Sequence, residues 1–409
     1  MPEGGLFRDG GLPFHVSPEP FELDPKVRKQ LERLGPVLLK FQMACDRLYR
    51  RSRKGAVTPW ISELLDSGKP EWLVAEQLDG VHKNSLPRVI RPDLLLTEDG
   101  LSMTELDSVP GGIGVTSWLS EQYDEVFGEG MLEGFQSISP EGLEIHVSEE
   151  SADYRPEMEY LSKRLNDEFG DYWSCVSAEE TTEVGDRVYR FFELFDWENV
   201  TNTRQAFTQQ EITPPLKPHL EEKLWLALFH TPALSAYWRE ELREKQITIL
   251  NQIIPFGWVV DPTPLPPHAS IPSLRLHSWD EVGELSQKNR ALVLKISGYS
   301  EEAWGSRGVT IGHDSSGADW IAAIRKAQDD FAENPYIMQK FSDTKLVEHP
   351  YYDQDGELRT MNGRVRLCPY YFVSPDYKEV QLGGVLVTIN PADKKKIHGM
   401  RDGILTVAK

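Results

Sequence analysis

Cysteines, leader-like segments and long apolar runs are scarce or missing in this sequence. Its 409 residues include only three cysteines, Cys45, Cys175 and Cys368, which are odd in number and far apart, so neither a disulfide framework nor a zinc site is expected. No apolar run approaches the roughly 20 residues of a membrane-spanning helix. The first residues, MPEGGLFRDG, lack the basic and then apolar order of a secretory signal. We therefore expect a cytoplasmic protein with no membrane partner.

Positive charge is also in short supply. The chain has 44 lysines and arginines against 65 aspartates and glutamates, which gives a formal net charge of -21. A field of this sign repels phosphate backbones, so we expect no nucleic acid partner. A small anionic ligand remains compatible with the charge, because charges beyond about 8 to 10 Å are largely screened at physiological salt.

The familiar catalytic motifs are missing as well. The sequence contains no GxxxxGK[ST], no GxGxxG, no HExxH, no GxSxG and no CxxC, and its ten histidines are scattered. These absences disfavour nucleophile triads and zinc sites.

What is present is an alternation of helical and strand patterns. Residues 24–55 have apolar side chains at three- to four-residue spacing and predict a helix that starts at Asp24 and Pro25 and stops at Gly55. Its basic end, RLYRRSRK, either binds an anion or complements the helix dipole. Strands, glycine-rich loops and further helices follow without an internal repeat, a mixture typical of the α+β fold class.

Lys295 is the first residue that suggests chemistry. It ends the apolar segment ALVLK, and a loop with glycines at 298, 305 and 308 follows. A lysine that leaves a strand can place its charge on a phosphate, and glycines let a loop bring backbone N–H groups against phosphate oxygens. Arg307 in this loop would add a forked donor. The alternative is an ordinary hairpin with an exposed lysine.

The stretch RPDLLLTEDGLSMTELDS, residues 91–108, reads as a β-hairpin that carries carboxylates. Mg²⁺ is usually bound by one or two carboxylates together with substrate phosphates. Because side chains alternate along a strand, we expect Leu101, Met103, Glu105 and Asp107 to share one face. The alternative to a metal site is a solvated strand face.

The turn decides whether Asp93 joins these acids. A two-residue loop at Asp99-Gly100 would pair Asp93 with Leu106 and turn it away, whereas a three-residue loop at 98–100 would pair it with Glu105. The three-residue loop would also pair Arg91 with Asp107. The metal hypothesis therefore predicts an odd-numbered loop.

Together the two features resemble the circularly permuted ATP-grasp ligases, in particular the synthetase domain of the glutathionylspermidine synthase type. In that family an R-x-D strand and an E-x-N strand precede the strand lysine and the glycine-rich lid, and residues 88–120 and 290–400 follow this order. The resemblance implies an ATP-grasp fold, with the nucleotide held between two sheet-containing subdomains, and ATP and Mg²⁺ as cofactors.

The resemblance also implies a division of the chain. Residues 1–87 would form an N-terminal helical region, and residues 88–254 the metal-binding hairpin with the substrate region. Residues 255–275, which are rich in proline, would form an extended connector. Residues 276–409 would form the lid and nucleotide-binding subdomain.

Matched position by position, the resemblance assigns roles to single residues. It implies that the catalytic residues are Arg91, Lys295 and Arg307 and that the Mg²⁺ ligands are Asp93, Glu105 and Asp107. The other residues expected to contact the nucleotide are Gly305, Ser306, Gly308, Gln339, Lys340, Phe341, Arg364 and Arg366.

Two positions depart from the family pattern. Asp107 stands where the family usually has asparagine. The family's second ATP lysine lies in an N-K-x-x-L segment, and its expected counterpart here, FHTPALSAYW (229–238), has no lysine.

The implied reaction joins a small-molecule carboxylate to an amine through an acyl phosphate. Alternatives are an ATP-dependent small-molecule kinase and a degenerate ATP-grasp protein that binds a nucleotide or a partner without turnover. The sequence does not identify the acid or the amine. GGIG (111–114) is either a turn or an anion-binding nest. The sequence does not determine the oligomeric state; a homodimer is one candidate, because dimers are the commonest oligomers.

Overall fold

The computed structural model describes residues 14–78, 82–107, 109–200, 207–303, 307–394 and 402–409. The chain divides into two compact units. Unit 1 comprises residues 1–43, 75–217 and 343–409, and unit 2 comprises residues 44–74 and 218–342. Within the described ranges, no helix has the length and apolar character needed to cross a bilayer.

Helix α1 (Pro25–Arg53) confirms the helix predicted near the N-terminus. The Asp24 carboxylate accepts a hydrogen bond from the Lys26 N–H at 2.8 Å, and Gly55 follows with a φ of +69°. The predicted apolar face is buried: Leu31, Leu34, Leu38, Phe41, Cys45 and Leu48.

The basic end of α1 is paired with acids. Arg47 and Arg51 contact Glu241, Arg50 contacts Asp46 at 2.8 Å, and Arg53 contacts Asp66 at 3.3 Å. These ion pairs lie within unit 2, and they occupy the arginines that an anion would have used.

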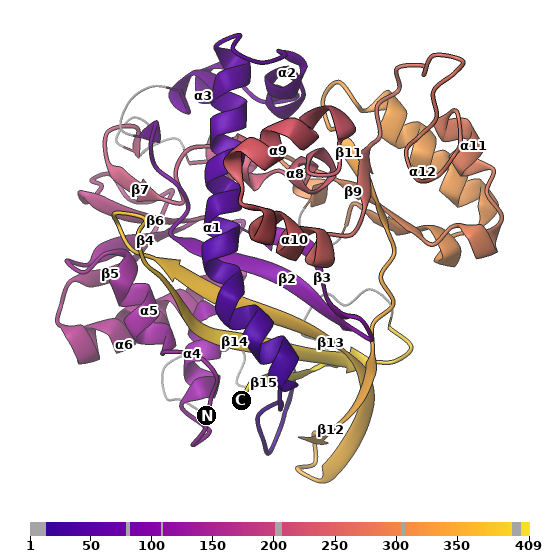
Figure 1. The fold of residues 1–409 in the computed structure, drawn as a ribbon. Helices are drawn as coiled ribbons and strands as arrows, with labels where there is room; N and C mark the ends of the chain where they lie inside the picture. Colours follow the sequence, from indigo (N-terminus) through magenta and orange to yellow (C-terminus); the bar gives the residue numbers. More distant parts are fainter. Residues whose placement is uncertain (1–13, 79–81, 108, 201–206, 304–306, 395–401) are drawn as a thin grey trace. The chain divides into compact units, whose positions relative to one another are not determined.

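The main sheet of unit 1 has seven strands in the order β12-β1-β15-β14-β13-β2-β3. Figure 1 shows β2, β3, β13 and β14 side by side. Because β12 also pairs with β13, five of the strands close on themselves. The seven strands are β1 (His15–Val16), β2 (Val89–Thr97), β3 (Gly100–Asp107), β12 (Leu346–Tyr352), β13 (Leu358–Val373), β14 (Val380–Pro391) and β15 (Ile404–Val407).

Helices cover both faces of this sheet. On one face the Tyr371 hydroxyl donates to the Leu31 carbonyl of α1 at 2.7 Å. On the other face Tyr370 and Phe372 join a core that includes helices α4 (Ile113–Ser120) and α5 (Met131–Ile138). Aromatic residues that alternate along β13 therefore bind the sheet to helices on its two sides.

A second sheet in unit 1 is entirely parallel, in the order β5-β4-β6-β7. Parallel strands need crossovers, and a helix supplies the one between β4 and β5. The elements are β4 (Leu143–Val147), η3 (Ala152–Tyr154), α6 (Arg155–Phe169), β5 (Trp173–Ser177), β6 (Arg187–Phe191), η4 (Leu194–Glu198) and β7 (Glu211–Thr213).

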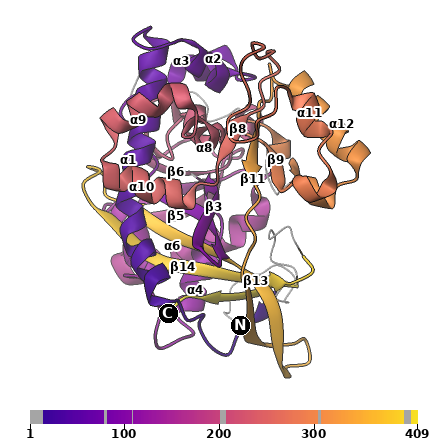
Figure 2. The ribbon, with the colours of Figure 1, turned by 45° about the vertical axis from the view of Figure 1, so that its right-hand side comes forward.

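Unit 2 has a four-stranded antiparallel sheet in the order β10-β9-β11-β8. Helices α11 (Trp279–Gly283) and α12 (Gly317–Asp329) share a hydrophobic core with β9 (Figure 2). The strands are β8 (Gly257–Val259), β9 (Leu292–Ile296), β10 (Val309–Ile311) and β11 (Tyr336–Lys340).

The remaining elements are short and mostly helical. They are α2 (Trp60–Asp66), α3 (Glu71–Glu76), η5 (Pro218–Glu221), α8 (Leu224–Leu228), η6 (Pro232–Leu234), α9 (Ser235–Glu241), α10 (Glu244–Ile253), η7 (Gln287–Asn289), η8 (Glu301–Ala303) and η9 (Gly312–Asp314).

The two units divide the chain differently from the four predicted ranges. The C-terminal strands β12–β15 lie in unit 1 because β13 pairs with β2. The proline-rich stretch lies within unit 2. It includes strand β8, with Trp258 in the core, while residues 261–268 are exposed and form neither helix nor strand.

Candidate functional site

The acidic hairpin has a two-residue turn and a bulge. Thr97 pairs with Gly100, so only Glu98 and Asp99 lie in the loop, and the predicted odd-numbered loop is wrong. The register then shifts between Asp93 and Leu94. Thr104 is the additional residue on β3, and its hydroxyl donates to the Asp93 carbonyl at 3.3 Å.

This bulge produces the predicted pairing by another route. Asp93 lies opposite Glu105 and Arg91 lies opposite Asp107, which confirms the expected partners. The prediction that Met103 and Glu105 share a face is wrong, because the additional residue between them reverses the alternation. Met103 pairs with Leu94 and is fully buried. The bulge thus lets β3 keep an apolar face and present its acids on the other.

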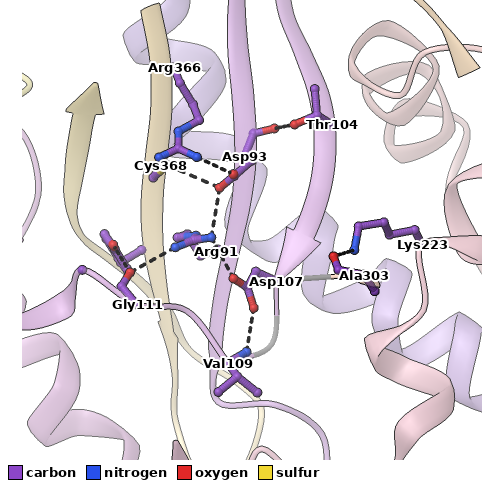
Figure 3. A network of polar contacts seen from close by, with 12 residues as sticks. Arg91, Asp93, Thr104, Asp107, Val109, Gly111, Lys223, Ala303, Arg366 and Cys368 are labelled. Carbon is purple, nitrogen blue, oxygen red and sulfur yellow. Dashed lines mark hydrogen bonds and ion pairs between the residues drawn. The ribbon is translucent and has the colours of Figure 1, made fainter. Parts of the chain in front are cut away.

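Three strands contribute to a charged network on one sheet face (Figure 3). Arg91 Nη2 lies 2.7 Å from an Asp107 oxygen and 3.1 Å from an Asp93 oxygen. Arg366 Nη1 from β13 lies 3.1 Å from the other Asp93 oxygen, and the Cys368 thiol lies 3.4 Å from the first. The Asp107 carboxylate also accepts from the Val109 N–H at 2.8 Å.

Burial and neighbouring charges set the protonation of these groups. Burial raises the pKa of Asp107; Arg91 opposes the shift, while Glu105 and Asp93 add to it. Burial acts to lower the pKa of Arg91, but Asp93 and Asp107 outweigh it, so that pKa is raised. Burial, followed by the Asp93 charge, raises the pKa of Cys368 to about 12. The thiol is therefore neutral at pH 7, and both arginines are charged.

The three predicted metal ligands do not form a compact ligand group. Asp93 is only 6% exposed, and both its oxygens accept from arginine or cysteine. Within the described ranges, no three His, Cys, Asp or Glu side chains are placed to hold a metal ion. The carboxylates have the chemistry of Mg²⁺ ligands, but their arrangement fits arginine binding instead.

Unit 2 contains the predicted ATP lysine. Lys295 lies in β9 between β10 and β11, opposite Val309 and Ile337. It is 8% exposed, and its Nζ donates to Gln339 Oε1 at 3.0 Å. The Gln339 Nε2 is buried and makes no hydrogen bond within the described residues. A phosphate or base near these groups would find one ammonium and one available amide donor.

The predicted lid is described only in part. Gly305 and Ser306 lie outside the described residues. Arg307 is exposed and precedes β10. Gly308 is packed so closely that a Cβ there would lie 2.5 Å from the Ile296 side chain, which explains the glycine.

Lys223 is a candidate site residue that the sequence motifs did not single out. It precedes α8 in the segment Glu222-Lys223-Leu224-Trp225-Leu226. Its Nζ lies 3.4 Å from the Ser297 carbonyl and 3.3 Å from the Ala303 carbonyl, on the loop after β9 (Figure 3). The segment fits K-x-x-L with Glu in place of the preceding Asn, and its lysine lies six residues before the stretch 229–238, which has none.

The other predicted nucleotide contacts are placed as follows. Lys340 is exposed, and its ammonium lies 5.7 Å from the centroid of the Phe256 ring. The Phe341 ring lies edge-on to His313, with centroids 4.4 Å apart. Arg364 donates to the Ala392 carbonyl, just after β14, and to Thr344, just before β12, so its guanidinium is bound to loops of unit 1. Of the two β13 arginines predicted to contact the nucleotide, only Arg366 belongs to the charged network.

Comparisons with known proteins support the fold. The chain aligns over 97% of its length, and over 90% of the other chain, with the apo structure of a glutathione synthetase-like effector from Globodera pallida, with a TM-score of 0.56 and 11% identity. The chain shares the fold of that protein. A structure of a putative γ-glutamylcysteine synthetase from Methylobacillus flagellatus aligns with a TM-score of 0.45 and 12% identity over 90% of this chain and 86% of that one. No family model matches the sequence, and the curated proteins give no match.

Proposed function

We propose that this protein is an ATP-dependent ligase that joins a carboxylate to an amine through an acyl phosphate. The observation that carries the proposal is the network of Arg91, Asp93, Asp107 and Arg366 on one sheet face, in a fold shared with a glutathione synthetase-like protein. We also propose the circularly permuted ATP-grasp order, because the hairpin precedes the Lys295 strand in the chain.

The proposed chemistry has two steps. An oxygen of the substrate carboxylate attacks the γ-phosphorus of ATP, the bond to the β,γ-bridging oxygen breaks, and ADP leaves. The amine nitrogen then attacks the acyl carbon, the bond to the phosphate oxygen breaks, and a proton and inorganic phosphate are released with the amide. Both steps place negative charge on phosphoryl oxygens, so positioned cations and N–H donors are the main catalytic requirement.

Unit 2 supplies donors for the nucleotide in this proposal. Lys295 and Gln339 would bind phosphate oxygens or the base from β9 and β11. Lys223 would add a second ammonium; it already bonds to carbonyls at the beginning and end of the 297–303 loop. If Lys223 takes the place of the family's second ATP lysine, it supports turnover over the alternative of a degenerate nucleotide binder.

Unit 1 supplies the two arginines. The Nε groups of Arg91 and Arg366 are buried and make no hydrogen bond within the described part of the chain. Unpaired buried donors are costly, and an anionic substrate group or phosphoryl oxygen would satisfy them. Asp93 would then act mainly by orienting the two guanidinium groups.

Magnesium enters the proposal only as part of the substrate Mg·ATP. The assignment of Asp93, Glu105 and Asp107 as its ligands stays a prediction of the family resemblance. Both Asp93 oxygens already accept from arginine or cysteine in the structure, so the proposed steps do not depend on a metal held by these three residues.

The test is ADP release from Mg·ATP in the presence of amino acids, polyamines and small peptides, followed by mass spectrometry of the product. We expect an amide product and a loss of about 10²- to 10³-fold in ATP consumption for Lys295→Ala, and a similar loss for Glu105→Gln if Glu105 is the Mg²⁺ ligand that the family resemblance implies. The exposed residues Lys288 and Glu98 give the matched controls Lys288→Ala and Glu98→Gln, which should keep full activity.

Two other results have clear meanings. A phosphorylated acceptor in place of an amide identifies a kinase. Binding of Mg·ATP without ADP release identifies a nucleotide-binding protein without turnover. Full turnover by both Lys295→Ala and Glu105→Gln contradicts the proposed site whatever the product is.

A further inference from the structure

Two buried side chains of β14 extend the charged network along the same sheet face. Thr388 pairs with Arg366 of β13, and Asn390 pairs with Arg364. Residues that pair directly in an antiparallel sheet point to the same side, so Thr388 and Asn390 lie on the face where Arg366 contacts Asp93. They are 0% and 1% exposed. The face is therefore polar across β2, β13 and β14.

The polar groups along this face are buried and lack partners. Within the described residues, Asn390 Nδ2, the Thr388 hydroxyl and the Nε groups of Arg366 and Arg91 make no hydrogen bond. We call these four residues the donor strip, because each can donate a hydrogen bond. A buried donor without an acceptor is costly. The donor strip therefore fits a ligand with acceptor atoms and does not fit a cation.

The neighbouring acids use other atoms of the two arginines. Asp93 contacts Arg366 Nη1 and Arg91 Nη2, and Asp107 contacts the same Arg91 nitrogen. The Gly111 carbonyl accepts from Arg91 Nη1 at 3.0 Å. The acids thus orient the guanidinium groups and leave both Nε donors for a ligand.

The glycine-rich segment GGIG is already bound by the protein itself. Glu157 in the first turn of α6 is 2% exposed, and its carboxylate accepts from the Gly112 N–H at 2.7 Å and the Val115 N–H at 3.2 Å. These backbone donors lie at the beginning of α4. The chain fills this nest with its own carboxylate, so a substrate cannot use these amides.

The two ends of the donor strip differ in access. The side chains of Arg91 and Arg366 are 14% and 12% exposed, whereas Thr388 and Asn390 are almost fully buried. Paired residues on adjacent strands stand about 5 Å apart and diagonal neighbours about 7 to 8 Å. A ligand group at the two arginines would therefore have a second group, a few bonds further along its chain, at Thr388 and Asn390.

We propose that Thr388 and Asn390 select an acid substrate that carries a second acceptor group, a carboxylate or an amide carbonyl. The reacting carboxylate binds at the more exposed end, to Arg91 and Arg366. The second group accepts from the Thr388 hydroxyl and the Asn390 amide. An acid with an apolar chain leaves both donors unpaired, and a site built to hydrogen-bond its substrate rejects such an analogue. This specificity rests on the proposed function.

Calorimetric titration without ATP tests the selection. Glutarate and its monoamide, glutaramate, carry the second acceptor, and valerate has a chain of the same length without it. We expect the unmodified protein to bind glutarate or glutaramate about tenfold or more tighter than valerate, and Thr388→Val and Asn390→Leu each to reduce this preference about three- to tenfold. A preference for glutaramate identifies an amide as the second group, and a preference for glutarate a carboxylate. Equal binding of all three acids overturns the proposal.

Thr406 on β15 provides the matched control. It is also 0% exposed, but its hydroxyl bonds to the Glu19 carbonyl at 3.2 Å and to the Tyr123 hydroxyl at 3.3 Å. Thr406→Val should lower the urea midpoint and keep the preference among acids. Thr388→Val should not lower the midpoint, because its hydroxyl has no partner in the described part of the chain. A Thr388→Val variant that is destabilised and keeps the preference overturns the proposal.

Turnover separates this proposal from the ligase proposal. If the acids bind with the expected preference but ATP is not consumed with any amine, the ligase proposal fails and the donor strip remains an acid-binding site. If ATP is consumed equally well with valerate and with the acceptor-bearing acids, the ligase proposal stands and the selection by Thr388 and Asn390 is overturned.

Discussion

Asp93 is the residue at which two interpretations of the hairpin make opposite predictions. If the acids are metal ligands that repel one another, removing one charge from the metal-free protein relieves the repulsion. If Asp93 instead binds two arginines, as its contacts with Arg91 and Arg366 at 3.1 Å indicate, removing its charge takes the ion pair from the buried Arg366 and leaves Arg91 with Asp107 alone.

We therefore predict that Asp93→Asn destabilises the protein in EDTA by about 3 to 5 kcal/mol, the usual cost of breaking a buried ion pair. Urea unfolding measures the change, and Asp99→Asn at the exposed turn is the matched control. A variant more stable than the unmodified protein in EDTA would favour the metal interpretation.

In strand β3, one additional residue places the apolar side chains and the acidic side chains on opposite faces. Before the bulge, Leu101 and Met103 pair with Leu96 and Leu94 and are apolar. After the bulge, the β3 residues on the network face are Glu105 and Asp107. A regular strand would place Met103 and Glu105 on one face. The bulge separates them, so the core and the network do not compete for the same positions.

Two single-residue deletions in β3 should therefore differ. Deleting Thr104 removes only the additional residue and keeps every pairing, so we expect a loss of about 1 kcal/mol or less. Deleting Ser102 also leaves β3 with no additional residue, but Thr104 then takes a paired position and Met103 turns from the core to the network face. This change should cost about 2 to 5 kcal/mol of unfolding free energy. Urea unfolding of the two variants compares them, and an equal loss would show that the bulge does not set the register.

At the scale of the whole molecule, the two units are interleaved along the chain. Unit 1 is assembled from residues 1–43, 75–217 and 343–409, with unit 2 segments between them. The central strands β13 and β14 come from the last segment, while β2 and the helices that pack on the sheet come from the earlier ones. Neither unit is a continuous piece of sequence, so folding of unit 1 requires the last segment.

We predict that residues 1–342 alone do not form unit 1, because β2 then lacks β13 and the helices lack Tyr370 and Phe372. Near-ultraviolet circular dichroism should show loss of fixed aromatic packing. Co-expression of residues 343–409 should restore it, with the two pieces purifying together. Intact aromatic signals from residues 1–342 alone would contradict the assignment of unit 1.

The sequence by itself determined what depends on neighbours along the chain. The periodicity of 24–55 predicted helix α1, the apolar segment before Lys295 predicted β9, and the two acid-bearing segments predicted a hairpin. These patterns are local, because a short stretch of sequence is enough to show the period at which its buried residues recur. The fold class followed from the mixture of such patterns.

Only the tertiary structure decided which distant residues meet. The bulge at Thr104 follows from the need to bury Met103 while Glu105 faces Asp93, and no turn motif encodes it. Arg366 and Cys368 reach Asp93 because β13 pairs with β2 across more than 260 positions. Glu157 reaches Gly112 because α6 packs on α4. Such contacts arise from close packing of whole elements, so the single residues that complete the candidate site carry no signal in their own segments.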